Sequence, residues 1–257
     1  MIPDFTVVVA LDRGHLEQFY TVWPTWVAYR PEIMQRRLVL IVDLADHERD
    51  DALRRWVEGL QFVLQVHPQV EFFEWDWRPD LPQRERMLTG LVRAGDFVQT
   101  PYYLKLDVDA IATKPGPWIM PEWFAESPAL IASPWSYSRP GSVIETLDRW
   151  GDGIPDLCSK PPLGFRPVAG SEIVKHPRII SWCCFVNTEF SRWASSLAPE
   201  RLPVPSQDTY LFYCAARAGK KVVTVKMKSY GWDHCLRTST LRRISREVLK
   251  SHEQRAT

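Results

Sequence analysis

Two aspartates lie near the end of the segment Tyr102-Tyr103-Leu104-Lys105-Leu106-Asp107-Val108-Asp109-Ala110-Ile111. The apolar residues in front of them predict a short buried strand. Because side chains alternate between the two faces of a strand, we expect Asp107 and Asp109 to point the same way. Neighbouring carboxylates repel each other unless a cation or hydrogen-bond donors neutralise their charge. The segment therefore predicts either a divalent metal site that holds a phosphorylated substrate, or a strand end whose acids are solvated.

Buried strands and helices alternate along the chain before this segment. The expected strands are residues 5–11, 38–43 and 70–75, and the expected helices are residues 17–29, 50–66 and 83–95, with Gly95 as the C-terminal cap of the last one. This alternation is typical of an α/β fold in which helices flank a mostly parallel sheet.

Acidic residues follow several of these strands. Parallel α/β sheets bind ligands at the carboxyl ends of their strands. The acids at those positions are Asp12, Asp43, Asp107 and Asp109. Their shared place at one edge of the sheet favours a binding site over independently solvated acids.

The second half of the chain is less regular. Proline and glycine are frequent between residues 114 and 177, which predicts short helices and a long loop over residues 151–170. The later expected elements are strands at 129–133, 179–186 and 222–225, a helix from Gln207 to Ala218 closed by Gly219, a loop at 230–234, and a basic amphipathic surface helix at 241–255. No internal repeat or linker divides the sequence, so we expect a single domain over residues 1–257.

The composition is that of an ordinary globular protein, with 45% hydrophobic and 25% charged residues among 257 and a net charge of +1. Such a charge gives no global attraction to nucleic acid or membranes. No segment approaches the about 18 consecutive apolar residues of a membrane span, and the N-terminus lacks the features of a signal peptide. The five cysteines show no Cys-x-x-Cys spacing, which is typical of reduced thiols in a cytoplasmic protein.

The order of these motifs resembles that of the nucleotide-sugar-dependent glycosyltransferases of the GT-A fold. The resemblance covers roughly residues 5 to 235. The matching features are the strand Val7-Val8-Val9-Ala10, Asp43 after the second strand, the segment Leu104-Lys105-Leu106-Asp107-Val108-Asp109, the strand from Trp182 to Phe185, the Gln207-Asp208 pair and His234. It implies a Rossmann-like GT-A domain with a nucleotide-sugar-binding half at 1–115, an acceptor and catalytic half at 116–240, and a basic C-terminal helix at 241–257.

The resemblance also implies a metal ion and a donor substrate. Asp107 and Asp109 match the Asp-x-Asp motif that holds Mn²⁺ or Mg²⁺ on the donor diphosphate, and His234 matches a further metal ligand, with Asp233 beside it as a second candidate. The implied donor is a nucleotide-diphosphate sugar, with a UDP-sugar as the first expectation. The other residues expected at the donor are Ala10, Leu11, Asp12 and Asp43 for the base and ribose, Arg84 and Arg86 for the diphosphate, and Trp182 for stacking.

Asp208 matches the acid that deprotonates the acceptor hydroxyl in inverting members of the family. A helix N-terminus stabilises an ionised carboxylate, which suits a base. The preceding residue is Gln207, where many inverting members have an acid, so a retaining mechanism stays open. Trp232, like Trp182, is a candidate for stacking on a sugar or base.

Other functions fit parts of the same pattern. The sequence does not distinguish a glycan, a lipid, a protein or modified DNA as the acceptor. If the acceptor is DNA, as in phage base-glycosylating enzymes, the basic tail would contact phosphates. A haloacid-dehalogenase-like phosphatase also has an Asp-x-Asp motif after a strand, although there it follows the first strand and has Thr or Val where this chain has Ile111. A non-catalytic carbohydrate- or nucleic-acid-binding module is the third alternative, favoured by the twelve tryptophans.

Overall fold

The computed structural model describes residues 1–11, 15–42, 70–74, 82, 89–134, 179–198, 207–234 and 238–256. The expected helix at 50–66, residues 83–88 of the expected helix at 83–95, and the expected loop at 151–170 lie outside these residues. The chain divides into two compact units. The carboxylate unit, named for Asp107 and Asp109, comprises Thr6–Met87, Leu106–Trp118 and Met227–Thr257, and the β7 unit comprises Met1–Phe5, Leu88–Lys105 and Ile119–Lys226. The single-domain organisation stays a prediction.

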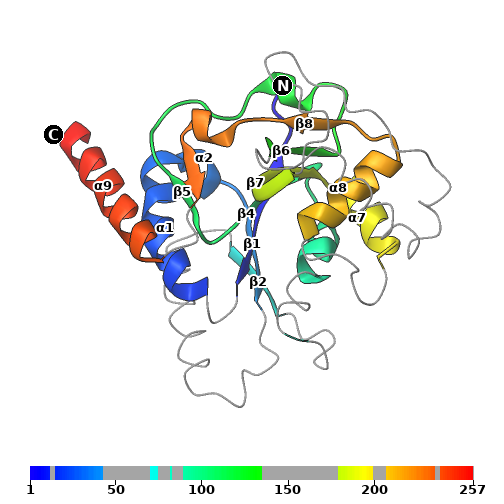
Figure 1. Cartoon of the computed structure of the whole chain (residues 1–257), viewed down its shortest axis with the longest axis horizontal. Helices are drawn as coiled ribbons and strands as arrows, with labels where there is room; N and C mark the ends of the chain where they lie inside the picture. The colour runs from blue at the N-terminus through cyan, green and yellow to red at the C-terminus, as the bar shows by residue number, and fades with distance from the viewer. Residues whose placement is uncertain are drawn as a thin grey trace. The chain divides into compact units, whose positions relative to one another are not determined.

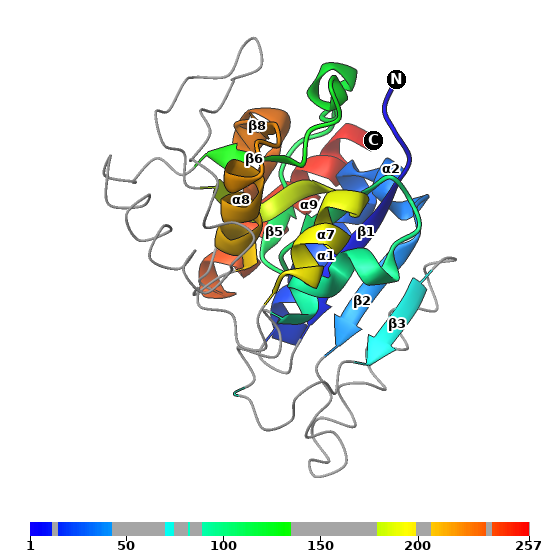
Figure 2. The same cartoon turned by 90° about the vertical axis from the view of Figure 1, so that its right-hand side faces the viewer.

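Three parallel strands form the main sheet of the carboxylate unit. They are β1 (Phe5–Leu11), β2 (Leu38–Val42) and β3 (Val70–Glu74), with β2 in the middle. Val7 pairs with Leu38 and Leu38 with Val70, and the three strands point the same way (Figure 2). The described side chains of β1 and β2 are almost all buried, as in strands that are covered on both faces. These expected strands are confirmed.

Two long helices of the carboxylate unit pack against each other. In its described part, the helices are α1 (Leu16–Tyr29), α2 (Pro31–Met34) and α9 (Thr238–Ala256), with the 3₁₀ helix η5 (Met227–Tyr230). α9 lies along α1 (Figure 1). The Ser245 hydroxyl donates to the main-chain oxygen of Thr21 at 2.7 Å, and the Tyr29 hydroxyl donates to that of Val248 at 3.0 Å. The expected helices at 17–29 and 241–255 are confirmed.

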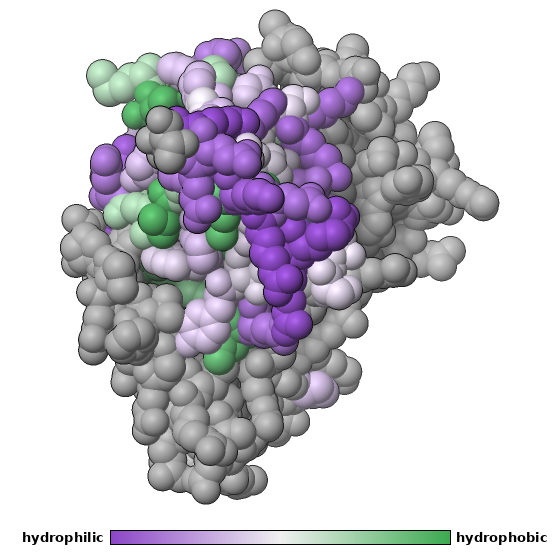
Figure 3. Space-filling model, turned by 90° about the vertical axis from the view of Figure 1, so that its left-hand side faces the viewer, coloured by the Kyte–Doolittle hydropathy of each residue, from purple (hydrophilic) through white to green (hydrophobic). Residues whose placement is uncertain are grey.

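The outer face of α9 is polar. Leu241 and Val248 are buried, whereas Arg242, Arg246 and Lys250 are exposed. Figure 3 looks at the molecule from the side on which α9 lies in Figure 1, and the described surface there is mainly hydrophilic. This distribution is that of an amphipathic surface helix. Within the described ranges, no helix is long and apolar enough to cross a membrane.

A small second sheet also belongs to the carboxylate unit. Strand β5 (Ala110–Ala112) pairs antiparallel with β9 (Trp232–His234). The expectation of a loop at residues 230–234 is therefore wrong. A strand of three residues is too short to show an alternating pattern, and β9 forms because a partner strand more than a hundred residues away supplies its hydrogen bonds.

The described part of the β7 unit contains four strands, in the spatial order β4 (Tyr102–Leu106), β7 (Ile179–Asn187), β6 (Leu130–Pro134) and β8 (Val222–Thr224). β6 is antiparallel to β7 and parallel to β8. The helices are α7 (Thr188–Ser196) and α8 (Gln207–Arg217), with the 3₁₀ helices η3 (Arg93–Phe97) and η4 (Pro121–Phe124). Helix α7 was not expected. The four strands of this unit and helix α8 were expected and are confirmed. Mostly parallel strands flanked by helices confirm the α/β class.

Gly95 does not cap a helix. It lies inside η3 and its φ is not positive, whereas Gly219, with a φ of 69°, follows α8 as the expected cap. A Cβ atom on Gly95 would lie 2.8 Å from the Oγ atom and 2.9 Å from the Cβ atom of Ser191 on α7. Glycine is needed here because α7 packs against η3 with no room for a side chain.

We expect Gly95→Ala to lower the free energy of unfolding by about 1–3 kcal/mol, because the added methyl group overfills a packed contact. Urea denaturation followed by circular dichroism measures the change. In a Ser191→Gly background the same substitution should cost less, because the two atoms closest to the methyl group are absent and only the Arg192 amide nitrogen, at 3.2 Å, remains. Equal costs in both backgrounds would contradict this packing.

Candidate functional site

Asp107 and Asp109 lie on a tight turn between two strands. β4 ends at Leu106, β5 begins at Ala110, and the amide of Ala110 donates to the main-chain oxygen of Asp107 at 3.0 Å. The expectation of one continuous strand, with both carboxylates on one face by alternation, is therefore wrong. No glycine or proline marks the turn, although aspartate at its first position is a common turn residue.

Helix α1 fixes the backbone that follows the two aspartates. The indole Nε1 of Trp26 donates to the main-chain oxygen of Ala110 at 2.7 Å. The amide of Ala112 donates to the Thr25 hydroxyl at 3.3 Å, and that hydroxyl donates to the main-chain oxygen of Val22 at 2.6 Å. Trp26 and Thr25 are both completely buried. Consecutive residues of one helix thus hold the first and last residues of β5.

The carboxylates differ in exposure. Asp109 is 4% exposed, whereas Asp107 is half-buried. Burial of Asp109 restricts its side chain to few positions, and the half-buried Asp107 is the more accessible of the two to a ligand. Both carboxylates precede β5 directly, so the contacts from α1 to β5 also determine where the turn lies.

Strand β9 brings His234 next to this turn. In the β5–β9 pair, Ala110 lies opposite His234, Ile111 opposite Asp233, and Ala112 opposite Trp232. The Asp233 carboxylate accepts from the amide of His234 at 2.8 Å and forms an ion pair with Lys228 at 2.8 Å. His234 is half-buried. The residue after Asp109 therefore has His234 as its cross-strand neighbour, which places three of the predicted site residues in one small region of the carboxylate unit.

Trp232 has a structural role. It is fully buried, with Arg30 over its ring at 5.0 Å and the ring of Trp118 at 5.1 Å in an edge arrangement. The expectation that Trp232 stacks on a sugar or base is therefore wrong. The sequence alone could not show that Arg30 and Trp118 cover the ring of Trp232.

The turn and β9 carry side chains of the types that bind divalent metals. Carboxylates suit both Mn²⁺ and Mg²⁺, and an imidazole is a ligand for Mn²⁺ as well as for softer metals. Among the described residues, no group of three or more His, Cys, Asp or Glu side chains is already assembled around a metal position. Mg²⁺ commonly takes one or two carboxylates from the protein and its other ligands from phosphates and water. The donor set therefore suits a metal–diphosphate complex better than a closed protein site.

The predicted base- and ribose-binding residues lie at the end of β1. Ala10 is half-buried and pairs with Ile41, and Leu11 is fully buried and pairs with Val42. The other residues predicted to contact the donor on this side, namely Asp12, Asp43, Arg84 and Arg86, lie outside the described residues.

The remaining predicted residues belong to the β7 unit. Asp208 is half-buried in the first turn of α8, after a buried Gln207. Trp182 on β7 is 3% exposed, which leaves little of its ring for a ligand to contact. The roles of Asp208 and Trp182 stay predictions.

The buried thiols of this unit are unsuited to nucleophilic chemistry. Cys183, Cys184 and Cys214 are buried, as expected for reduced core residues. Burial raises the pKa of Cys214 to about 12, so this thiol is neutral at pH 7.

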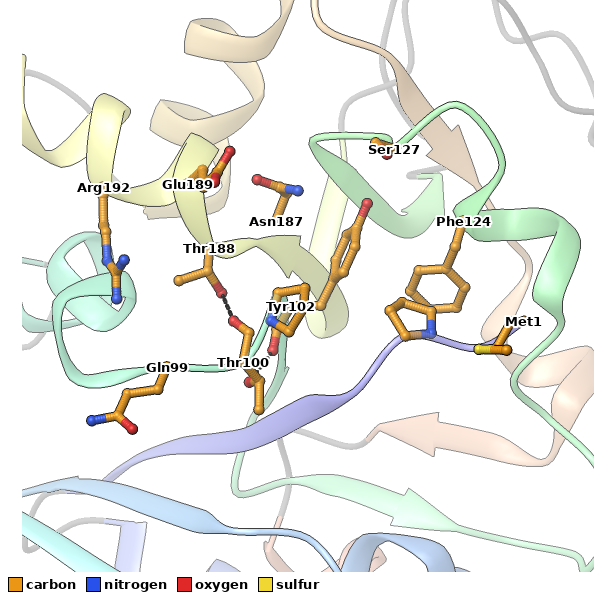
Figure 4. Close-up of a pocket in the computed structure, with 12 residues that line it drawn as sticks. Met1, Gln99, Thr100, Tyr102, Phe124, Ser127, Asn187, Thr188, Glu189 and Arg192 are labelled. Atoms are coloured by element: carbon orange, nitrogen blue, oxygen red, sulfur yellow. Dashed lines mark hydrogen bonds between the residues drawn. The ribbon is translucent and has the colours of Figure 1, made fainter.

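The β7 unit also has a cavity of about 560 Å³ near the start of β4 (Figure 4). Polar side chains that line it form hydrogen bonds to the main chain of other segments. The Thr188 hydroxyl donates to the main-chain oxygen of Thr100 at 2.7 Å, and the Tyr102 hydroxyl donates to that of Pro128 at 3.0 Å. Asn187 caps α7 by accepting from the amide of Phe190 at 2.9 Å. None of the predicted site residues that the structure describes lines this cavity.

Comparison with solved structures gives the fold family. The chain is similar to an active-site mutant of LgtC, with a TM-score of 0.52 and 11% identity over 94% of this chain and 82% of that one. LgtC is a galactosyltransferase, and its complex with donor and acceptor sugar analogues gives a TM-score of 0.49 at 11% identity, over 85% and 73% of the two chains. The mannosyltransferase PcManGT from Pyrobaculum calidifontis, in complex with GDP-Man and Mn²⁺, gives 0.48 at 13% identity, over 88% and 55%.

No protein-family model matches the chain, and no curated protein matches it in sequence. The comparison with LgtC confirms the expected fold: the chain has the GT-A fold of glycosyltransferases. At 11% identity the similarity extends to the fold alone, so the activity has to be argued from the chain's own residues.

The sequence patterns did not identify Thr25 or Trp26 as residues of the site. Both looked like ordinary core positions of an aromatic-rich helix, and only the fold shows their bonds to β5. No local signal distinguishes an indole that binds a distant carbonyl from one that only fills space.

We expect Trp26→Phe to destabilise the protein by about 1–3 kcal/mol, because it leaves the buried oxygen of Ala110 without its indole donor. Amide exchange of residues 110–112 should accelerate in parallel. Trp193→Phe on α7, a residue of the β7 unit, is the matched control and should leave that exchange unchanged. Unchanged exchange in Trp26→Phe would show that α1 does not hold β5.

Proposed function

We propose that the chain is a glycosyltransferase that moves a sugar from a nucleotide-diphosphate sugar to a hydroxyl acceptor. One observation supports this most directly: within a GT-A fold, the turn of Asp107 and Asp109 lies beside His234 through the β5–β9 pair. This combination favours sugar transfer over a haloacid-dehalogenase-like phosphatase, for which the chain would need a different fold around the same two acids.

Asp107, Asp109 and His234 are proposed to hold Mn²⁺ or Mg²⁺ against the donor diphosphate. When bound, such a metal supplies Lewis acidity that stabilises the negative charge of the leaving diphosphate. The contribution of the chain is to keep the carboxylates and the imidazole in place, and the bonds from Trp26 and Thr25 to β5 serve that purpose. Sharing the metal with phosphate oxygens would complete its ligand shell only when the donor is present.

The nucleoside is proposed to bind at the carboxyl ends of β1 and β2. Parallel sheets of this class bind nucleotides at that edge. Ala10 and Leu11, with Asp12 and Asp43, are the proposed contacts of the base and ribose, and Arg84 and Arg86 are proposed to neutralise the diphosphate. A UDP-sugar is the proposed donor, with Trp182 as a stacking residue.

Asp208 is the proposed base if the reaction inverts the sugar's configuration. Its place in the first turn of α8 supports an ionised carboxylate, because the helix N-terminus stabilises negative charge. It would accept the proton of the acceptor hydroxyl as that oxygen attacks the sugar carbon and the diphosphate leaves. In a retaining reaction the acceptor attacks on the face that the diphosphate leaves, and Asp208 would then have no such duty.

Ligand-induced thermal stabilisation tests the proposed site. The wild-type protein should gain stability with a panel of nucleoside diphosphates and sugar nucleotides only when Mn²⁺ is present. At a donor concentration of about 100 Kd, the gain is about 2.7 kcal/mol, or on the order of 5–10 °C in Tm. Asp107→Asn and Asp109→Asn should each abolish the metal-dependent part, because the amide keeps the shape of the side chain but loses its charge.

Asp96→Asn is the matched control, since Asp96 is exposed on η3 in the β7 unit, and it should respond to ligands like the wild type. A wild-type protein that no member of the panel stabilises, and that hydrolyses a generic phosphate ester, would rule out the transferase proposal.

A further inference from the structure

Arg30 lies at the junction between α1 and α2, and its side chain is completely buried. Pro31 begins α2, and a proline disfavours helical geometry in the residue that precedes it. Arg30 therefore leaves the helix, with φ −133° and ψ 56°. This break sends the guanidinium into the carboxylate unit instead of along the surface of α1. The sequence alone shows an Arg-Pro pair at a helix end and gives no sign of a buried charge.

The guanidinium of Arg30 binds main-chain oxygens of two distant segments. Its Nη1 atom donates to the oxygens of Tyr29 at 2.8 Å and Lys114 at 3.0 Å. Its Nη2 atom donates to the oxygens of Tyr230 at 2.9 Å and Gly231 at 2.8 Å. These bonds connect the end of α1, the chain after β5, and the chain directly before β9.

The fit around Arg30 is close. The rings of Trp118 and Trp232 lie 5.6 Å and 5.0 Å from its guanidinium carbon, so two indoles cover the charge. Gly231 has a φ of 80°, and a Cβ atom on it would lie 2.8 Å from the Arg30 Nη2 atom and 2.6 Å from the Cγ atom of Lys114. The main-chain oxygen of Gly231 also accepts from the amide of Thr113 at 2.8 Å. Gly231 is therefore held by Arg30 and Thr113 together.

The planar fork of arginine suits this arrangement better than lysine. Arginine can direct two nitrogens at two pairs of acceptors at once, while an ammonium group is a single point with a preference for full hydration. Trp232, Asp233 and His234 follow Gly231 without interruption. A shift of residues 230 and 231 would therefore move His234 relative to Ala110 and the two aspartates.

We infer that Arg30 is a positioning residue for the proposed metal site: its bonds to Tyr230 and Gly231 keep His234 beside the turn of Asp107 and Asp109. This inference rests on the proposed function, because it assigns His234 to the metal. Arg30 does not touch the donor or the metal itself. It acts through the backbone of β9.

The test measures how Mn²⁺ is bound with UDP, using pulsed electron paramagnetic resonance to detect a nitrogen ligand on the metal. Wild type should show coupling to one imidazole nitrogen, and His234→Ala should not. In Arg30→Lys, the metal should still bind the carboxylates, but the nitrogen coupling should be lost. The affinity for Mn²⁺ should fall by about tenfold or more, as it does when other residues that orient metal ligands are changed. Arg246→Lys, an exposed change on α9, is the matched control and should behave like wild type.

A double-mutant cycle separates positioning from a general structural effect. If Arg30 acts through His234, Arg30→Lys should not weaken Mn²⁺ binding further once His234 is alanine. Additive losses, or a folded Arg30→Lys protein that keeps the nitrogen coupling, would overturn the inference. If Arg30→Lys does not fold, Gly231→Ala replaces it, because its methyl group disturbs the same bonds from the other side.

Amide hydrogen exchange tests whether Arg30 holds β9 independently of metal binding. In Arg30→Lys the amides of β5 and β9 should exchange faster than in wild type, whether or not Mn²⁺ is present. A wild-type protein that binds no Mn²⁺ with UDP overturns the proposed function, and exchange then still decides whether Arg30 holds β9. Wild-type Mn²⁺ binding without nitrogen coupling overturns the assignment of His234, and with it the inference.

Discussion

The buried guanidinium of Arg30 is the contact on which the arrangement of the candidate site depends. A completely buried charge is costly unless hydrogen bonds and favourable electrostatics compensate it. Here four main-chain oxygens accept from it and two indole rings cover it. Because those oxygens belong to three separate segments, the compensation is lost if any segment moves. The hydrogen bonds of this buried charge thus fix the end of α1 relative to the chain after β5 and the chain directly before β9.

The end of helix α1 contacts both the chain after the aspartate turn and the chain before β9. Trp26 lies in the last turn of α1, and Arg30 is the residue directly after the helix. Trp26 binds Ala110 directly after the aspartate turn, and Arg30 binds Gly231 directly before β9. The β5–β9 pair then closes the arrangement by placing Ala110 opposite His234. Residues distant in sequence are brought together by contacts to one helix rather than by a continuous motif.

The sequence predicted the class of fold because its strands carry long apolar runs, such as Phe5–Leu11, and its helices carry periodic aromatic residues. It named Asp107, Asp109 and His234 as candidates for one site, but it gave no sign of the strand pair that brings the backbone of His234 beside Ala110. The turn at Asp107, the short strand β9 and the role of Gly95 depend on tertiary contacts that no local pattern carries. Arg30 was missed for the same reason, since its partners are main-chain oxygens, which every residue possesses.

We propose that Asp107, Asp109 and His234 form one metal–diphosphate site in a GT-A fold. A crystal structure of the protein with Mn²⁺ and UDP, with the metal located by its anomalous scattering, tests this claim most directly. We predict one strong Mn²⁺ peak within coordination distance of a carboxylate oxygen of Asp107 or Asp109, of His234 and of the diphosphate, with Arg30 still bound to Tyr230 and Gly231. A peak remote from these side chains, or UDP bound elsewhere without metal, would contradict it.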